Sequence, residues 1–293
     1  MLVFSSSDTG AGTVSPDNLT CTYDDWNAYK NITVYGVNDN LTDGNQTFSV
    51  IIEGDNQTLD SKYNSLDVDD IFVVNVDDDT PGFTITPISG PTSEEGGTAT
   101  FTFKVNTVPD DLDSSTNNDN VTINISSSDT TEGTVYPSQL VFTKSNWNSE
   151  NQITVTGVDD NVSDGNQSYS IILDVDNSTT AVGYSILNPS DVNLYNIDSD
   201  SPGFYVSSIS GDTDENLKTA TFTVSLSSAP SSDNVTITMK SSDTTEGVIS
   251  AVSNTSTDNT SQLVFTSSDW NSVRTVTVTG VADNLSDGDQ AYA

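Results

Sequence analysis

Residues 98–105 read TATFTFKV, a run in which Ala99, Phe101, Phe103 and Val105 alternate with threonine and lysine. Successive side chains of a β-strand point to opposite faces, so this alternation predicts a strand with one apolar and one polar face. The same period of two recurs in VTINI (121–125), ITV (153–155) and YSIIL (169–173). No segment has helical periodicity, and an all-β chain is therefore expected.

The chain also repeats itself. GVNDNLTDGNQTFSV from Gly36, GVDDNVSDGNQSYSI from Gly157 and GVADNLSDGDQAYA from Gly280 are three versions of one acidic loop, 121 and 123 residues apart. A Trp-Asn pair before the preceding β run keeps the same phase in every copy. These features indicate tandem copies of one unit, joined at the Pro-Gly pairs 81–82 and 202–203.

The middle copy shows how the unit is built. It contains about seven short strands with one apolar face each, a pattern typical of a two-sheet, antiparallel, immunoglobulin-like sandwich. We therefore expect beads on a string: a partial sandwich in 1–80 without its N-terminal strands, a complete one in 81–201, and a partial one in 202–293 without its C-terminal strands.

The two partial copies have two interpretations. Met1 corresponds to Thr122 and Ala293 to Ser170, so the sequence starts and stops out of phase with its own repeat. We expect a piece of a longer array. The alternative is strand donation between chains, which would need complementary partial copies, yet both contain the segment equivalent to 122–170.

Charge and composition exclude several classes of function. The 293 residues include 43 Asp and Glu against 7 Lys and Arg, for a net charge of −36. Nucleic acids and anionic membranes need a basic surface, so neither is an expected partner. With no histidine and only Cys21, the usual zinc, thiol and Ser/His/Asp sites cannot be assembled. No stretch is apolar enough to insert in a membrane.

Carboxylates are the remaining plentiful functional groups, and in the middle copy they fall at strand ends. Acids from several such ends that converge would repel one another unless a cation neutralised them. Calcium takes six to eight oxygen ligands in irregular loops, and Gly165 would allow the loop to bend around it. The alternative interpretation is that these acids are ordinary turn residues of an acidic protein.

The stretch TSEEGGTATFTFKV (92–105), the loop GVDDNVSDGNQSYSIIL and a closing acidic tripeptide resemble the Calx-beta domain, a calcium-binding sandwich of exchangers, integrins and large bacterial surface proteins. The resemblance covers essentially all of 81–201 and implies that acids at matching positions meet around calcium. In the middle copy these are Glu95, Asp129, Asp159, Asp160, Asp164, Asp198 and Asp200. In the first copy they are Asp8, Asp39, Asp43, Asp77, Asp78 and Asp79, and in the third Glu215, Asp243, Asp283 and Asp287.

The chain departs from the family pattern in the loop. Calx-beta domains usually carry two glutamates there, whereas this chain has Asp164 followed by Gln167. The first acid of the Asp-Asp pair becomes Asn38 in one copy and Ala282 in another. Fewer charged ligands imply fewer or weaker ions.

Repetition favours a structural role. We expect a segment of an extracellular or cell-surface tandem-repeat protein, an adhesin stalk, surface layer or filament, with neighbouring repeats or copies of itself as partners and no enzymatic activity. The alternative is a module that binds a cell-surface glycan or protein through its loops, of which the insertion at 251–259 is the most variable. Recurrent Asn-x-Ser/Thr motifs are consistent with a glycoprotein.

Overall fold

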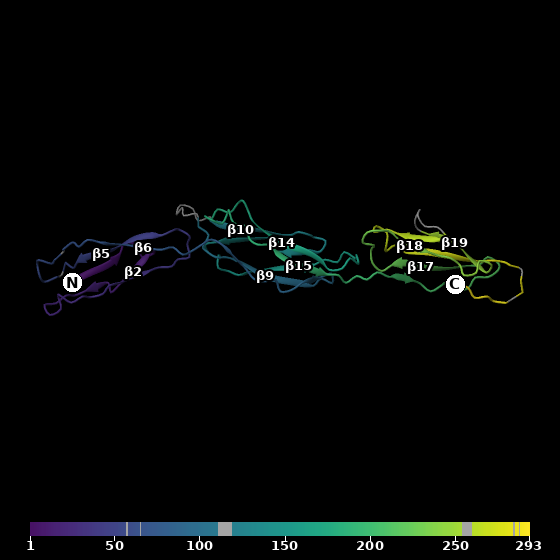
Figure 1. The fold of residues 1–293 in the computed structure, drawn as a ribbon, viewed down its shortest axis with the longest axis horizontal. Helices are drawn as coiled ribbons and strands as arrows, with labels where there is room; N and C mark the ends of the chain where they lie inside the picture. The colour runs from purple at the N-terminus through teal and green to yellow at the C-terminus, as the bar shows by residue number, and fades with distance from the viewer. Residues whose placement is uncertain (57, 65, 111–118, 254–259, 284, 287) are drawn as a thin grey trace.

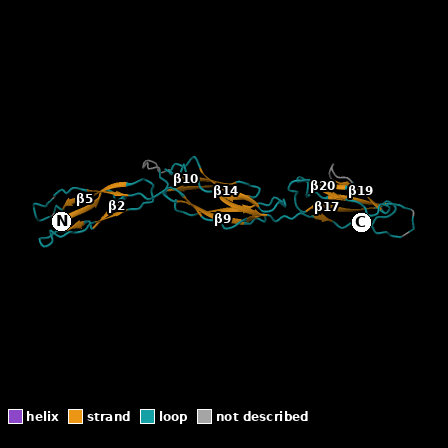
Figure 2. Ribbon diagram, in the orientation of Figure 1, coloured by secondary structure: helices purple, strands orange, loops and turns teal. Residues whose placement is uncertain are grey.

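The computed structural model describes all residues except 57, 65, 111–118, 254–259, 284 and 287. Every regular element in the described part is a β-strand, as the strand colouring of Figure 2 shows. The all-β prediction is confirmed. None of the described residues forms a helix long and apolar enough to cross a membrane.

The strands fall into three groups, which lie one after another along the long axis (Figure 1). The first group holds β1 (Leu2–Ser6), β2 (Gly12–Ser15), β3 (Asn18–Leu19), β4 (Thr33–Gly36), β5 (Gln46–Gly54) and β6 (Ile71–Asn75). The middle group holds β7 (Phe83–Ile85), β8 (Thr92–Ser93), β9 (Thr98–Val105), β10 (Asn120–Ser127), β11 (Gly133–Tyr136), β12 (Gln139–Thr143), β13 (Asn151–Gly157), β14 (Gln167–Val175) and β15 (Val192–Ile197). The third group holds β16 (Phe204–Val206), β17 (Thr219–Leu226), β18 (Val235–Thr238), β19 (Gly247–Ser253), β20 (Gln262–Phe265) and β21 (Arg274–Gly280).

Within the described residues, each group contains two sheets. Those of the middle group have the strand orders β12-β10-β14-β15-β8 and β11-β13-β9-β7. The first group has β3-β1-β5-β6 and β2-β4, and the third has β16-β17-β21-β19 and β18-β20. Among the described strand pairs all are antiparallel except β15 with β8, where Ile197 lies opposite Ser93 in a parallel register.

The two sheets of the middle group share one hydrophobic core. The alternation predicted from the sequence is confirmed: Ala99, Phe101, Phe103 and Val105 of β9 are all buried. From the opposite sheet Phe142 meets Phe103, with ring centroids 5.9 Å apart. Because the core draws side chains from both sheets, the middle group is a two-layer sandwich.

The described residues of the middle group form two strands more than the sequence pattern indicated. The additional strands are β8, of two residues, and β11, which begins at a glycine. Neither is long enough to show an alternating apolar face, so periodicity cannot detect them. β8 nevertheless leads directly into the acidic pair Glu94 and Glu95.

The first group leaves more of its apolar surface exposed than the middle group does. Its described residues form no counterparts of β7, β8 and β9, and Ile71 of β6 is exposed whereas Val192, at the matching place in β15, is buried. In the third group β19 takes in the first three residues of the insertion at 251–259. The other six lie outside the described residues.

Candidate metal centre

The acidic loop of the middle group joins β13 to β14 and is closed by its own carboxylates. Asp159 Oδ1 accepts the N–H of Asn161 at 2.9 Å, and Asp160 Oδ1 accepts the N–H of Val162 at 2.8 Å. Such turns are the usual local use of aspartate. Gly165 has a φ of 80° and donates its N–H to Asp198 Oδ2 at 2.6 Å. The loop is thereby fixed against the segment that follows β15.

Two carboxylate clusters lie at this end of the middle group. We call Glu94, Asp159 and Asp200 the exit cluster, and Glu132, Asp160 and Asp164 the loop cluster. In each cluster one oxygen from every residue lies within 4.8 Å of the other two. Three all-oxygen side chains at this spacing can chelate one hard cation.

The exit cluster is built where β8 pairs with β15. Glu94 is buried, its N–H donates to the Ile197 carbonyl at 3.1 Å, and its Oε2 accepts the N–H of Ser199 at 2.7 Å. Asp200 donates its N–H to Asp198 Oδ1 at 2.7 Å. Asp200 Oδ2 is buried but has no hydrogen-bond donor among the described residues. A buried carboxylate oxygen without a donor is costly, and a cation would satisfy it.

Glu132 of the loop cluster is held by Asn196, a buried residue of β15. Its Nδ2 donates to the Val158 carbonyl at 2.9 Å and to Glu132 Oε2 at 3.5 Å. Its Oδ1 accepts the hydroxyl of Thr92 at 2.9 Å. Asn196 therefore ties β8, the start of the acidic loop and the buried carboxylate of Glu132 to one another.

Burial and mutual repulsion disfavour the charged form of several carboxylates in the two clusters. The pKa values of Glu94, Glu132 and Asp200 are all raised, chiefly because burial disfavours the charged carboxylate. The negative charge of Asp160 adds to the pKa rise at all three residues. Deprotonated clusters of this kind attract a cation, and a bound cation would lower these pKa values again.

These raised pKa values predict an unusual pH dependence for the ion-free protein. The folded state holds these protons more tightly than the unfolded chain, whose carboxyls titrate near pH ~4. Stability should therefore fall as pH rises through the unfolded and then the folded pKa values. In chelator, we expect the melting temperature to be higher at pH ~4.5 than at pH ~7. A melting temperature that rises with pH across this range would contradict it.

Glu132→Gln should flatten this pH dependence because it removes one of the raised carboxyls. Asp129 does not mask this effect. Its pKa is lowered, mainly by the hydroxyl of Thr131, so its contribution to the free energy of unfolding has the opposite sign. That contribution is lost only as pH falls below the ordinary aspartate pKa, which is below the pH range compared in this experiment.

The structure brings together four of the seven acids named for the middle copy: Asp159, Asp160, Asp164 and Asp200. Asp198 lies beside them and receives two backbone N–H groups instead. Asp129 caps the turn before β11 and belongs to neither cluster. Glu95 is exposed and outside both clusters, and its neighbour Glu94 takes the place expected for it.

Sequence reasoning missed Glu132 and Asn196 as site residues, and of the adjacent strand-end acids Glu94 and Glu95 it chose Glu95 for the site. A signal for Glu132 was present, because SSDTTEG occurs in both the middle and third copies and includes Glu132 and Glu246. In the first copy the motif reads SSDTGAG, so Ala11 stands at the Glu132 position.

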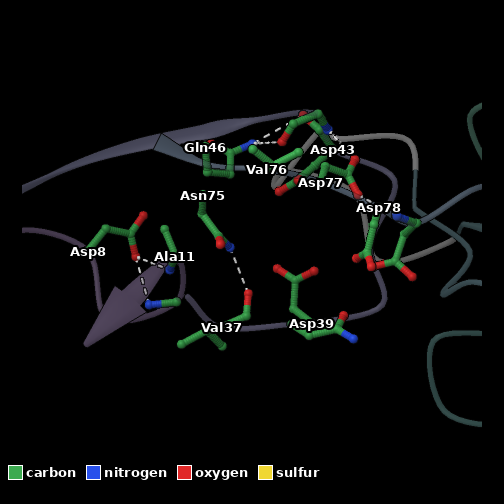
Figure 3. Close-up of a pocket in the computed structure, with 14 residues that line it drawn as sticks. Asp8, Ala11, Val37, Asp39, Asp43, Gln46, Asn75, Val76, Asp77 and Asp78 are labelled. Carbon is green, nitrogen blue, oxygen red and sulfur yellow. Dashed lines mark hydrogen bonds between the residues drawn. The ribbon is translucent and has the colours of Figure 1, made fainter. Parts of the chain in front are cut away.

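The first group has a different acidic pocket, shown in Figure 3. It is a cavity of about 140 Å³ whose lining includes Asp8, Asp39, Asp43, Asp77, Asp78 and Asp79. Asn75 repeats the role of Asn196, donating to the Val37 carbonyl at 2.8 Å. In the view of Figure 3, Asp8 lies apart from Asp39 and Asp77, beyond Asn75. Among the described residues, no three carboxylates of this pocket come as close together as those of the middle group.

The third group assembles no such cluster within its described residues. Glu215 is exposed, Asp283 Oδ1 accepts the N–H of Leu285, and Asp287 lies outside the described part. Asp243 Oδ1 accepts the N–H of Thr245 at 2.9 Å, and hydrogen bonds from Thr245 lower the pKa of its carboxyl. Asp243 thus repeats the turn-capping geometry of Asp129.

The fold and the site define a class of protein: an all-β chain of packed, mainly antiparallel sheets with clustered carboxylates where strands end. No model of a known protein family matches the sequence, and no curated protein matches it.

Proposed function

We propose that the chain is a structural segment of an extracellular surface protein, built from tandem immunoglobulin-like sandwiches of the Calx-beta type and stiffened by calcium. The proposed units are 1–80, 81–201 and 202–293. The pair of carboxylate clusters in the middle group carries the proposal. A structural repeat of this kind needs no catalytic site and gains reach with each copy.

The residues present fit calcium as the ion. Every ligand candidate is an oxygen, the geometry is set by irregular loops, and calcium accepts both conditions more readily than magnesium. Glu94, Asp159 and Asp200 would hold one ion, with Asp200 Oδ2 gaining a partner. Glu132, Asp160 and Asp164 would hold a second.

Bound calcium should stiffen the end of the middle group that faces the third group. The exit cluster joins three segments that are distant in the sequence: the end of β8, the acidic loop and the segment after β15. Asp200 directly precedes the Ser201-Pro202-Gly203 connection to the third group. An ion held there restrains the connection as well as the sandwich.

Thermal unfolding in chelator and in calcium tests the proposal. Free calcium at ten times its Kd should add about 1.4 kcal/mol of stability for each bound ion, because it binds only the folded state. The melting temperature should rise accordingly, and calorimetric titration should detect binding.

Two adjacent glutamates provide a matched pair of variants. Glu94→Gln removes a buried carboxylate of the exit cluster and should abolish the part of the calcium stabilisation that comes from the ion held there. Glu95→Gln alters an exposed neighbour with the same charge change and should leave it intact. Equal calcium responses in both variants, or no response in the unaltered chain, would sink the calcium proposal.

A further inference from the structure

The acidic loops of the first and middle groups make the same hydrogen bond to the group that follows. The carbonyl of Asn40 accepts the N–H of Val108 at 2.9 Å, and the carbonyl of Asn161 accepts the N–H of Ala229 at 2.7 Å. Donor and acceptor each recur after 121 residues. The contact is thus a repeated feature of the chain, made once at each junction between groups.

The segment that donates this hydrogen bond, residues 106–108 or 227–229, is the receiving segment, and it is bound from a second side at both junctions. Asn106 donates its N–H to the Gly82 carbonyl at 2.9 Å, and Ser227 donates to the Gly203 carbonyl at 3.0 Å. Gly82 and Gly203 belong to the Pro-Gly connections between groups. Residues 106–108 and 227–229 therefore bind the connecting chain on one side and the preceding acidic loop on the other.

The receiving segment is also fixed to its own group. Thr107 is buried, and the Tyr184 hydroxyl accepts its N–H at 3.0 Å. Ser228 and Ala229 are likewise buried. Pro109 and Pro230 follow directly, and a residue before proline is restricted to extended backbone. The donor N–H is thus held in a rigid, extended segment.

The acceptor is set by an uncommon backbone conformation. Asn40 and Asn161 both have a φ of 61°, in the left-handed region that asparagine enters more readily than most residues. The N–H of Asn161 is held by Asp159 Oδ1, and that of Asn40 by the amide oxygen of Asn38 at 3.3 Å. Because the amide of Asn38 takes the place of the carboxylate of Asp159, this turn does not require a charged side chain at that position.

We propose that Asn40 and Asn161, with the segments 106–109 and 227–230, form a repeated backbone clamp that sets the angle between consecutive groups. The clamp needs no bound cation. We therefore expect it to stiffen the first junction as well, where the described residues form no compact carboxylate cluster. The inference stands apart from the calcium proposal, and either can fail alone.

Spin-label distance measurements test the clamp at each junction. Cys21 is exposed and, paired with Ser149→Cys, reports on the first junction. In a Cys21→Ser background, Ser149→Cys and Asn271→Cys report on the second, and both positions are exposed. All samples are measured in chelator and in calcium. The unaltered chain should give one narrow distance across each junction even in chelator.

Asn161→Val is the disruptive variant, because a β-branched residue disfavours the left-handed conformation. It should raise the ratio of open to closed second junctions about fivefold, equivalent to about 1 kcal/mol for one hydrogen bond. The distance distribution should broaden in chelator. Asn161→Gly, which keeps the conformation, should not broaden it, and both variants lose the same Asn-x-Ser motif. Asn40→Val should act in the same way at the first junction.

Ala229→Pro removes the donor N–H without touching the acidic loop, and it should broaden the same distance. This second variant breaks the same hydrogen bond from the other side, so the test does not depend on whether the loop of Asn161→Val folds correctly. A broad distance at the first junction of the unaltered chain in chelator would overturn the proposal. So would narrow distances in both Asn161→Val and Ala229→Pro.

Discussion

Replacing Tyr184 with alanine is expected to lower the free energy of unfolding of the middle group by about 3–5 kcal/mol. The side chain is buried, with its ring centroid 5.6 Å from that of Phe83. Its hydroxyl also bonds Thr107 at 2.9 Å. The variant loses core packing and leaves buried polar groups of Thr107 without a partner. Denaturant unfolding monitored by tryptophan fluorescence measures the loss.

Tyr63 is the matched control, because it lies 121 residues before Tyr184 at the same place in the repeat. Its side chain is 62% exposed, so Tyr63→Ala should change stability by no more than about 0.5 kcal/mol. Similar losses in the two variants would contradict the packing argument. Tyr184→Ala should also broaden the distance across the first junction, since Tyr184 holds the donor segment of the clamp.

Gly157→Ala is expected to cost about 2–3 kcal/mol, because a Cβ there would overlap the Ser93 carbonyl oxygen and the Asn196 side chain. The backbone of Ser93 cannot move aside as easily as a side chain, so the overlap is not readily relieved. Displacement of Asn196 should also weaken the hold on Glu132, so the calcium stabilisation should decrease in the same variant.

Gly90→Ala is the control for this substitution. A Cβ at Gly90 would meet nothing within 4 Å, so the stability should be nearly unchanged. Chemical denaturation with and without calcium separates the two effects. Unchanged stability in Gly157→Ala would show that β8 and Asn196 can shift away, and would contradict the close packing of this corner.

Much of the sandwich could be predicted because its signals are local. The side chains of Phe101 and Phe103 share a face whatever else the chain does, since a strand alternates with a period of two. The repeats likewise required only comparison of the chain with itself. Burial of these positions followed, and both sheets of the middle group place their predicted apolar faces in one core.

The choice between Glu94 and Glu95 could not be made in this way. Neighbouring side chains of an extended segment point to opposite sides, so only one of the two can face the site. Which one does depends on the parallel pairing of Ser93 with Ile197, across more than a hundred residues. A strand as short as β8 leaves no periodic signal from which to infer that register.

The sequence by itself determined the longer strands, their apolar faces, the repeat and the acidic character of the loop, because each depends on neighbours along the chain. Only the tertiary structure decided which carboxylates meet, that Asn196 binds Glu132, and that Asn40 and Asn161 bind the following group. These are contacts between segments distant in sequence, set by sheet register and by how one group abuts the next. Chemical identity alone does not specify such contacts, since exposed and clustered aspartates look alike in sequence.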